Sequence, residues 1–103
     1  MNVVEITGTI VAVHPLEFSN IQGTLHQKII LNNVQGTSAN IDFPDRILVT
    51  VRYVNENDVI NFRVGDPITV KGDFVLAKPG NLSYMKNTHV PFGFIRYNDK
   101  IFA

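Results

Sequence analysis

Cysteine and tryptophan are absent from the 103-residue chain, and charged residues make up only 17% of it. Without cysteine, the protein has no disulfide, no thiolate metal site and no cysteine nucleophile. Nine basic residues balance nine acidic ones, so the formal net charge is zero. Proteins that bind polyanions without sequence preference usually carry a basic excess. Any contact with a polyanion therefore has to come from a local basic patch.

Signals for membranes, secretion and catalysis are also missing. No apolar run approaches the ~20 residues that a membrane helix needs, and the start MNVVEITGTI lacks the basic leader and apolar run of a signal peptide. His14, His26 and His89 show no metal-ligand spacing. No paired-carboxylate, nucleophile-elbow or phosphate-loop pattern occurs. We therefore expect a soluble cytoplasmic protein with no membrane contact, no metal, no cofactor and no catalytic activity.

What the chain does contain is β-forming sequence. Hydrophobic residues make up 45% of it, enough for the core of one small domain. Segments rich in Val, Ile, Thr and Phe are separated by short Asn, Gly, Pro and Asp clusters, which is typical of an all-β barrel or sandwich. We expect strands over about 3–13, 25–33, 46–54, 67–77 and 90–97, with Gly8 marking a bend or bulge. A turn at Asn98–Asp99 would let 100–102 pair back as a short ribbon.

Alternation along two of these segments predicts which side chains face the core. The segment RILVTVRYV places apolar side chains at every second position, as in a half-buried strand. Its expected inward residues are Ile47, Val49, Val51 and Tyr53, and its outward ones are Arg46, Thr50 and Arg52. In PITVKGDFVLA the expected inward residues are Ile68, Val70, Phe74 and Leu76, and the outward ones are Thr69, Lys71 and Asp73.

The order of these segments resembles the OB-fold, a five-stranded Greek-key barrel that often binds single strands or oligosaccharides. VVEITGTIVAV, RILVTVRYV and FRVGDPITVKGDFV are similar to the first, third and fourth strands of bacterial and phage single-stranded-DNA-binding proteins. The resemblance implies one OB-fold-like domain over residues 1–103 and binding of single-stranded DNA. The chain departs from that family in two ways: its connection between the third and fourth strands is short and rich in asparagine, and it has no tryptophan. That connection is the only plausible helical turn in the sequence. It ends at KIFA without an acidic-tipped tail, so we expect no tail-mediated partner recruitment.

Self-association is also expected. The outer side of the first strand carries Val3, Val11 and Val13, and a small barrel with few charges should leave some apolar surface uncovered. The single-stranded-DNA-binding proteins that the chain resembles are typically oligomers. A homodimer or homotetramer is therefore the expectation, and the alternatives are a monomer or a first strand that is buried on both sides.

Basic side chains define the candidate binding face. In OB-folds the second and third strands form the usual binding surface. Phosphate-tracking candidates on or near that surface are Lys28, Arg46 and Arg52, with Lys71 nearer the edge and Lys86 and Arg96 further along the chain. The alternative interpretation is that these are ordinary solubilising charges.

Aromatic residues divide into core and binding candidates. Tyr53, Phe62 and Phe74 are expected in the core, with Phe62 closing a barrel end and Phe43 packing over one. Tyr84 lies in the polar loop expected over about 78–89, where OB-folds often grip a strand. It either stacks on a base or folds back onto the barrel, and the sequence favours neither.

The stretch VPFGFIRY, residues 90–97, carries the last candidates. Its PFGFI part is similar to the aromatic–Gly–aromatic motif on which cold-shock domains stack bases. One side of the expected strand carries Val90, Phe92, Phe94 and Arg96, and the other carries Pro91, Gly93, Ile95 and Tyr97. Because the first side has more apolar bulk, we expect Phe94 to fill the core and leave Phe92 as a stacking candidate.

Two functions follow from these patterns. The leading hypothesis is a non-catalytic protein that binds single-stranded DNA, or RNA, through a basic groove with aromatic stacking. The alternative is an OB-fold module for protein–protein interaction or oligomerisation that binds no nucleic acid. The residues predicted for the first function are Lys28, Arg46, Arg52, Lys71, Tyr84, Lys86, Phe92 and Arg96.

Overall fold

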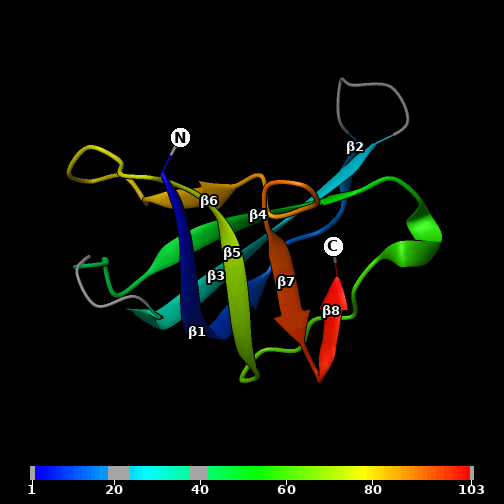
Figure 1. The fold of residues 1–103 in the computed structure, drawn as a ribbon, viewed down its shortest axis with the longest axis horizontal. Helices are drawn as coiled ribbons and strands as arrows, with labels where there is room; N and C mark the ends of the chain where they lie inside the picture. Colours follow the sequence, from blue (N-terminus) through cyan, green and yellow to red (C-terminus); the bar gives the residue numbers. More distant parts are fainter. Residues whose placement is uncertain (1, 19–23, 38–41, 103) are drawn as a thin grey trace.

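The computed structural model describes residues 2–18, 24–37 and 42–102, and every regular element among them except one 3₁₀ turn is a β-strand (Figure 1). No helix in this part of the chain is long and apolar enough to cross a membrane. The elements are β1 (Val3–Val13), β2 (Glu17–Phe18), β3 (Leu25–Gly36), β4 (Ile47–Tyr53), η1 (Glu56–Asp58), β5 (Pro67–Val75), β6 (Tyr84–Lys86), β7 (Phe94–Tyr97) and β8 (Lys100–Phe102).

Five strands close into a barrel in the order β1–β3–β4–β6–β5, because β1 also pairs with β5. All these pairings are antiparallel except the one between β4 and β6, which is parallel. The barrel is OB-fold-like, as the sequence predicts. The hairpin of β7 and β8 extends from β5 outside the closure, and β2 pairs only with the start of β3.

The fifth barrel strand is not where the sequence placed it. We expected it over residues 90–97, but β6 takes that position, inside the stretch expected to be a loop. Met85 is fully buried and pairs with Val49 on one side and Phe74 on the other. A strand of three residues is too short to show an alternating pattern, which is why this strand was missed.

The barrel core follows the alternation of its long strands. On β4 the four predicted inward residues are all buried, which confirms that prediction. The buried Tyr53 hydroxyl donates to Gln27 Oε1 at 2.8 Å and accepts from the Ile60 amide at 3.3 Å. Burial raises the pKa of Tyr53 to about 12. Each polar group in this cluster is therefore satisfied inside the protein, as buried polar groups require.

The end of β5 departs from the predicted pattern. Leu76, expected inside, is 72% exposed because β5 ends at Val75 and the alternation does not continue past it. Asp73, expected outside, is buried, and its carboxylate accepts a hydrogen bond from the Asn2 amide at 2.8 Å. The start of the chain covers this side chain, a contact that the local pattern of β5 cannot reveal.

Three smaller sequence predictions are confirmed. The pairing of β1 with β3 shifts register between Thr7 and Thr9, so a bulge lies at Gly8. Asn98 and Asp99 both adopt positive φ, as a two-residue turn of the I′ type requires, and they join β7 to β8. The expected helical turn is the single turn η1.

The remaining core aromatics lie in the core or against it. Phe62 is buried and its ring packs at 5.2 Å from that of Tyr97, on the hairpin extension. Phe43 is half-buried, with its ring edge-on to Phe74 at 5.3 Å.

Candidate nucleic-acid interface

The outer face of β3, β4 and β6 brings three basic side chains together. Lys28 pairs with Thr50 across β3 and β4. Lys86 follows Met85, which pairs with Val49 on β4, so it lies beside Thr50 on the other side. Across to β5, Lys86 pairs with Asp73. Arg52 is the next outward residue of β4. We call Lys28, Arg52 and Lys86 the basic triangle; it surrounds Thr50 on three neighbouring strands.

The outward positions of β3, β4 and β6 carry no acidic residue. On β3 they are His26, Lys28, Ile30 and Asn32, on β4 Leu48, Thr50 and Arg52, and on β6 Tyr84 and Lys86. Glu17 on β2 pairs with His26 and marks the border of this face. On the other side of the face, Asp73 of β5 pairs with Lys86, and its carboxylate accepts a hydrogen bond from the Asn2 amide. The outward positions of β3, β4 and β6 therefore carry only neutral and basic side chains, although the whole chain is neutral.

Tyr84 lies at the edge of the same face. It pairs with Leu48 on β4, which pairs with Ile30 on β3, so the three form an apolar row beside the basic triangle. All three are half-buried. Its place on a strand fixes Tyr84 on the barrel, and its outward direction leaves part of it accessible. Stacking of a base on Tyr84 stays a prediction.

The other predicted cations lie elsewhere. Arg46 precedes β4, where its Nε donates to Asn32 Oδ1 at 2.8 Å. It is six residues from Arg52, or ~20 Å along a strand. Lys71 on β5 pairs with Glu5 on one side and Phe94 on the other. Lys28, Arg52 and Lys86 therefore lie together, whereas Arg46 and Lys71 lie apart from them, and a role of these cations in binding stays a prediction.

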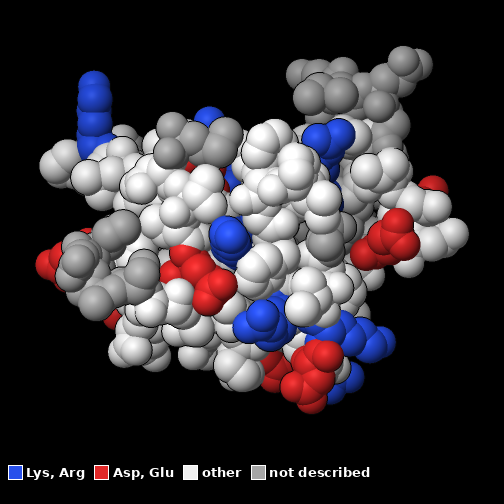
Figure 2. All heavy atoms as spheres, viewed as in Figure 1, with Lys and Arg blue, Asp and Glu red and all other residues white. Residues whose placement is uncertain are grey.

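The outer face of β5 and β7 differs in charge from the one that carries the basic triangle. These strands lie in front of β3 and β4 in Figure 1, and in the same view Figure 2 shows basic and acidic side chains intermingled. Arg96 lies over the ring of Phe94, with 5.3 Å between its guanidinium carbon and the ring centroid. On this face a cation therefore meets an acid or a ring of the protein itself.

The structure also corrects the faces of the stretch VPFGFIRY. Ile95 and Tyr97 are buried, whereas Phe94 is half-buried and faces outward under Arg96. The comparison of apolar bulk failed because Ile95 pairs with the buried Val70 and so inherits its inward direction. The expected start of the strand is wrong as well, because β7 begins only at Phe94.

Gly93 has a packing role in this stretch. A Cβ atom there would collide with the Lys71 carbonyl oxygen and lie 2.8 Å from that of Asn87. The glycine between the two phenylalanines therefore lets the chain pass close to β5. This requirement is enough to explain the aromatic–Gly–aromatic pattern without a base.

Phe92 lies at a pocket that sequence reasoning missed. The pocket has a volume of about 800 Å³ and opens between the end of β4, η1 and the connection from β6 to β7. We call it the β4–β7 pocket. Its apolar floor comes from buried or half-buried side chains of the barrel and the hairpin extension: Val51, Ile60, Ile95 and Phe102.

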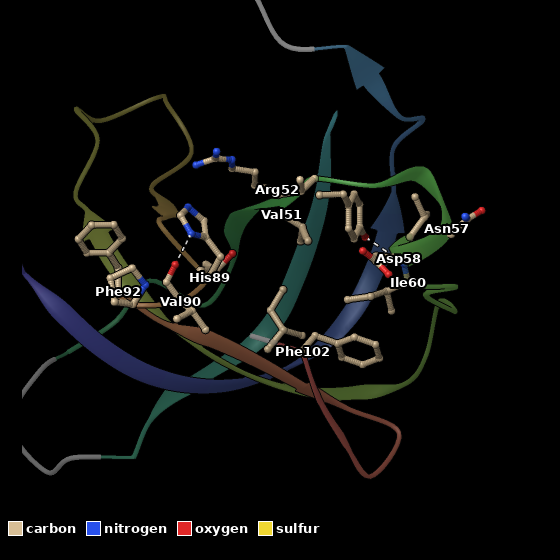
Figure 3. Close-up of a pocket in the computed structure, with 15 residues that line it drawn as sticks. Val51, Arg52, Asn57, Asp58, Ile60, His89, Val90, Phe92 and Phe102 are labelled. Atoms are coloured by element: carbon tan, nitrogen blue, oxygen red, sulfur yellow. Dashed lines mark hydrogen bonds between the residues drawn. The ribbon is translucent and has the colours of Figure 1, made fainter. Parts of the chain in front are cut away.

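Polar side chains stand on two sides of this pocket. In Figure 3 the Arg52 side chain reaches toward the side that carries His89 and Phe92, while Asp58 lies on the opposite side next to Ile60. The rings of His89 and Phe92 meet edge to face at 5.9 Å. Arg52 therefore belongs both to the basic triangle and to the pocket, so the two form one continuous surface.

Hydrogen bonds hold the connection that carries His89 and Phe92. Thr88 Oγ1 donates to the Thr50 carbonyl oxygen on β4 at 2.8 Å. The Phe92 and Gly93 amides both donate to the His89 carbonyl oxygen at 2.8 Å. Phe92 is 41% exposed, so the turn presents its ring at the rim of the pocket.

Sequence reasoning missed Asp58 and His89 as pocket residues because neither belongs to a motif. Only the folded chain brings them to the same pocket. The sequence does indicate that His26 and Leu48 lie on the outer face, since both occupy outward positions of predicted strands. Within residues 2–18, 24–37 and 42–102, no group of three or more His, Asp or Glu side chains could hold a metal ion.

Comparison with known proteins adds no relative to this description. The chain matches no protein-family model, no curated protein and no solved structure.

Proposed function

We propose that this protein binds single-stranded DNA, without catalysis, on the outer face of β3, β4 and β6. The basic triangle would track phosphates, and Tyr84 with Leu48 would support the bases. The observation that carries the proposal is the cluster of Lys28, Arg52 and Lys86 around Thr50, on an OB-fold-like barrel, with no acidic residue at the outward positions of these strands. Grooves of this kind combine backbone tracking with stacking.

The decisive experiment measures the anisotropy of fluorescent oligo-dT over a series of salt concentrations. We expect binding that weakens with salt, because each phosphate contact on a single strand adds about 0.7 to the slope of log K against log salt. The variant Lys28→Ala/Arg52→Ala/Lys86→Ala should bind roughly 100-fold more weakly, at about 1 kcal/mol per cation. Its slope should fall by about 2.

A matched control removes the same charge elsewhere. Arg63, Arg96 and Lys100 are all exposed and lie outside the basic triangle. Replacing these three by Ala should leave the affinity within about twofold and the salt slope unchanged. Equal losses in the two triple variants would show that only net charge matters. No binding by the unaltered protein at low salt would overturn the proposal.

RNA in place of DNA is an outcome of the same assay. Competition of oligo-U against labelled oligo-dT compares the two, since the ribose 2′-hydroxyl is the group that distinguishes them. Tighter binding of oligo-U would transfer the proposal to RNA.

The alternative function, a protein-interaction or oligomerisation module, is supported by exposed apolar side chains. Phe18 on β2 is 89% exposed, Val54 after β4 is 74% exposed and Val3 on β1 is 42% exposed. Exposed apolar surface of this kind is found at interfaces when it is contiguous. The expected homodimer or homotetramer stays a prediction, and sedimentation equilibrium tests it. An oligomer without oligonucleotide binding would favour the module.

A further inference from the structure

The β4–β7 pocket depends on the chain that follows the last barrel strand. Val51 and Ile60 come from the barrel side, while Ile95 and Phe102 come from β7 and β8. A barrel that ended after β6 would lack the second half of this hollow. Its volume of about 800 Å³ lies within the ~300–1,000 Å³ usual for small-molecule pockets, which also combine apolar walls with a few polar groups.

The polar groups on the two sides of this pocket differ in the charge that they can offer a ligand. Arg52 and His89, which can donate to an anion, stand on one side with the ring of Phe92, and the carboxylate of Asp58 stands on the other (Figure 3). A ligand that fits both sides carries an anionic group at one end, a flat apolar body and a hydrogen-bond donor at the far end. A nucleotide whose base bears an amino group has this arrangement.

We propose that the β4–β7 pocket takes one nucleotide of the bound strand and selects bases that carry an amino group. The phosphate lies against Arg52, the base enters the apolar hollow beside Phe92, and the amino group donates to Asp58. This inference rests on the proposed function, because Arg52 also belongs to the basic triangle and would deliver the strand to the pocket.

Asp58 gives the pocket its selectivity. A carboxylate only accepts hydrogen bonds, and cytosine, adenine and guanine each carry an exocyclic amine that can donate one. Thymine has no exocyclic amine, and its one edge donor, N3–H, lies between two carbonyl oxygens that the carboxylate would repel. A good base contact discriminates by roughly tenfold or more. Oligo-dC should therefore bind roughly tenfold more tightly than oligo-dT.

The first test compares these two oligonucleotides on Asp58→Asn and Glu56→Gln. Both substitutions remove one negative charge from the same 3₁₀ turn, but Glu56 does not line the pocket. The preference for oligo-dC should fall to about twofold or less in Asp58→Asn, because an amide also donates to thymine. It should persist in Glu56→Gln. An equal preference in both variants, or no preference in the unaltered protein, would overturn the inference.

The second test removes the ring at the rim. Phe92→Ala should weaken oligo-dC binding roughly tenfold, as loss of a stacking ring does. Phe18→Ala is the matched control, because Phe18 is more exposed and does not line the pocket. Thermal unfolding of both variants accompanies the assay. If Phe92→Ala lowers stability and leaves affinity unchanged, Phe92 is a packing residue and the pocket does not hold a base.

The two proposals fail in different ways. If oligo-dC and oligo-dT bind equally and the triple variant of the basic triangle loses both, the interface stands and the pocket inference is wrong. If neither oligonucleotide binds, the proposed function is wrong. NMR titration with free dCMP then gives the pocket its own result. Amide shifts at 51–53 and 88–95 that deoxyribose 5-phosphate does not produce would support a base site, and their absence would overturn it.

Discussion

Two outer faces of the barrel carry cations in different surroundings. On β3, β4 and β6, Lys28, Arg52 and Lys86 surround a threonine, and no acid occupies an outward position of these strands. The one acid paired with this group is Asp73 of β5, which pairs with Lys86 and is buried, with its carboxylate bonded to the Asn2 amide. On β5 and β7, Lys71 pairs with Glu5, and Arg96 lies over Phe94. The difference teaches that a basic residue becomes a binding candidate through its neighbours across the sheet. The first face should act in binding, and the second in stability.

The largest effect is expected where β7 approaches β5. Gly93→Ala places a methyl group against the Lys71 carbonyl oxygen, so we expect the free energy of unfolding to fall by about 3 kcal/mol. Urea denaturation measures this loss.

Gly80→Ala is the control for Gly93→Ala. Gly80 has φ +91°, but a Cβ atom there meets nothing within 4 Å. It should lose only about 1 kcal/mol, the cost of positive φ for a residue with a Cβ. Equal losses at the two glycines would show that β7 does not lie as close to β5 as described.

Two tyrosines beneath the two faces should differ in their contribution to stability. Tyr53→Phe leaves the buried Gln27 Oε1 and Ile60 amide without a partner, which should lower the free energy of unfolding by about 2 kcal/mol.

Tyr97→Phe is the matching substitution on β7. Its hydroxyl donates to Asp66 Oδ2 at 2.5 Å and accepts from the Arg63 amide at 2.9 Å. Water can replace it there because Asp66 is half-buried and Arg63 exposed, so we expect a loss of about 1 kcal/mol or less. Chemical denaturation measures the free energy of unfolding of both variants. A larger loss of that free energy in Tyr97→Phe than in Tyr53→Phe would contradict this ranking.

An acid inserted into each face tests their difference in binding. Thr50→Glu places a carboxylate within the basic triangle, and we expect oligo-dT affinity to fall about tenfold, or about 1.4 kcal/mol. Thr69→Glu makes the same change on β5, beside Arg96, and should alter affinity by less than about twofold. Equal effects of the two substitutions would remove the distinction between the faces.

The smallest effect is an alkaline loss of stability. The pKa of Tyr53 rises from 10.0 to about 12 through burial, and burial followed by the hydrogen bond to Asp66 also raises that of Tyr97. As pH rises from about 10 to 12, the unfolded chain loses the Tyr53 proton while the folded chain keeps it, so stability falls. Below pH 10 this contribution is fully present. Melting temperatures at about pH 9 and 11 should differ less in Tyr53→Phe than in the unaltered protein.

Long strands were the most predictable elements. Alternation over 46–54 gave the inward and outward sides of β4 correctly, because seven paired residues repeat the pattern several times. β6 was missed, since it has only three residues and Met85 is its only inward one. Phe94 was placed in the core because its side of the segment is bulkier, yet pairing with β5 turns Ile95 inward.

Part of the candidate site was predictable because it lies on long strands. Lys28 and Arg52 follow from alternation on two long strands. Lys86 and Tyr84 were named for their place in an expected loop, and only the parallel pairing of β6 with β4 brings them to the same face. Asp58 and His89 had no local signal, because the pocket that they line joins segments about 30 residues apart.

The sequence by itself determined that the protein is all-β, that a turn lies at Asn98–Asp99, and which sides of its long strands are apolar. Those properties depend on local periodicity and turn residues, which act over a few positions. Only the tertiary structure decided which strand closes the barrel, which cations share a face and where a pocket opens. Each of these depends on pairing between distant segments, and the register of such pairing is not written in either segment alone.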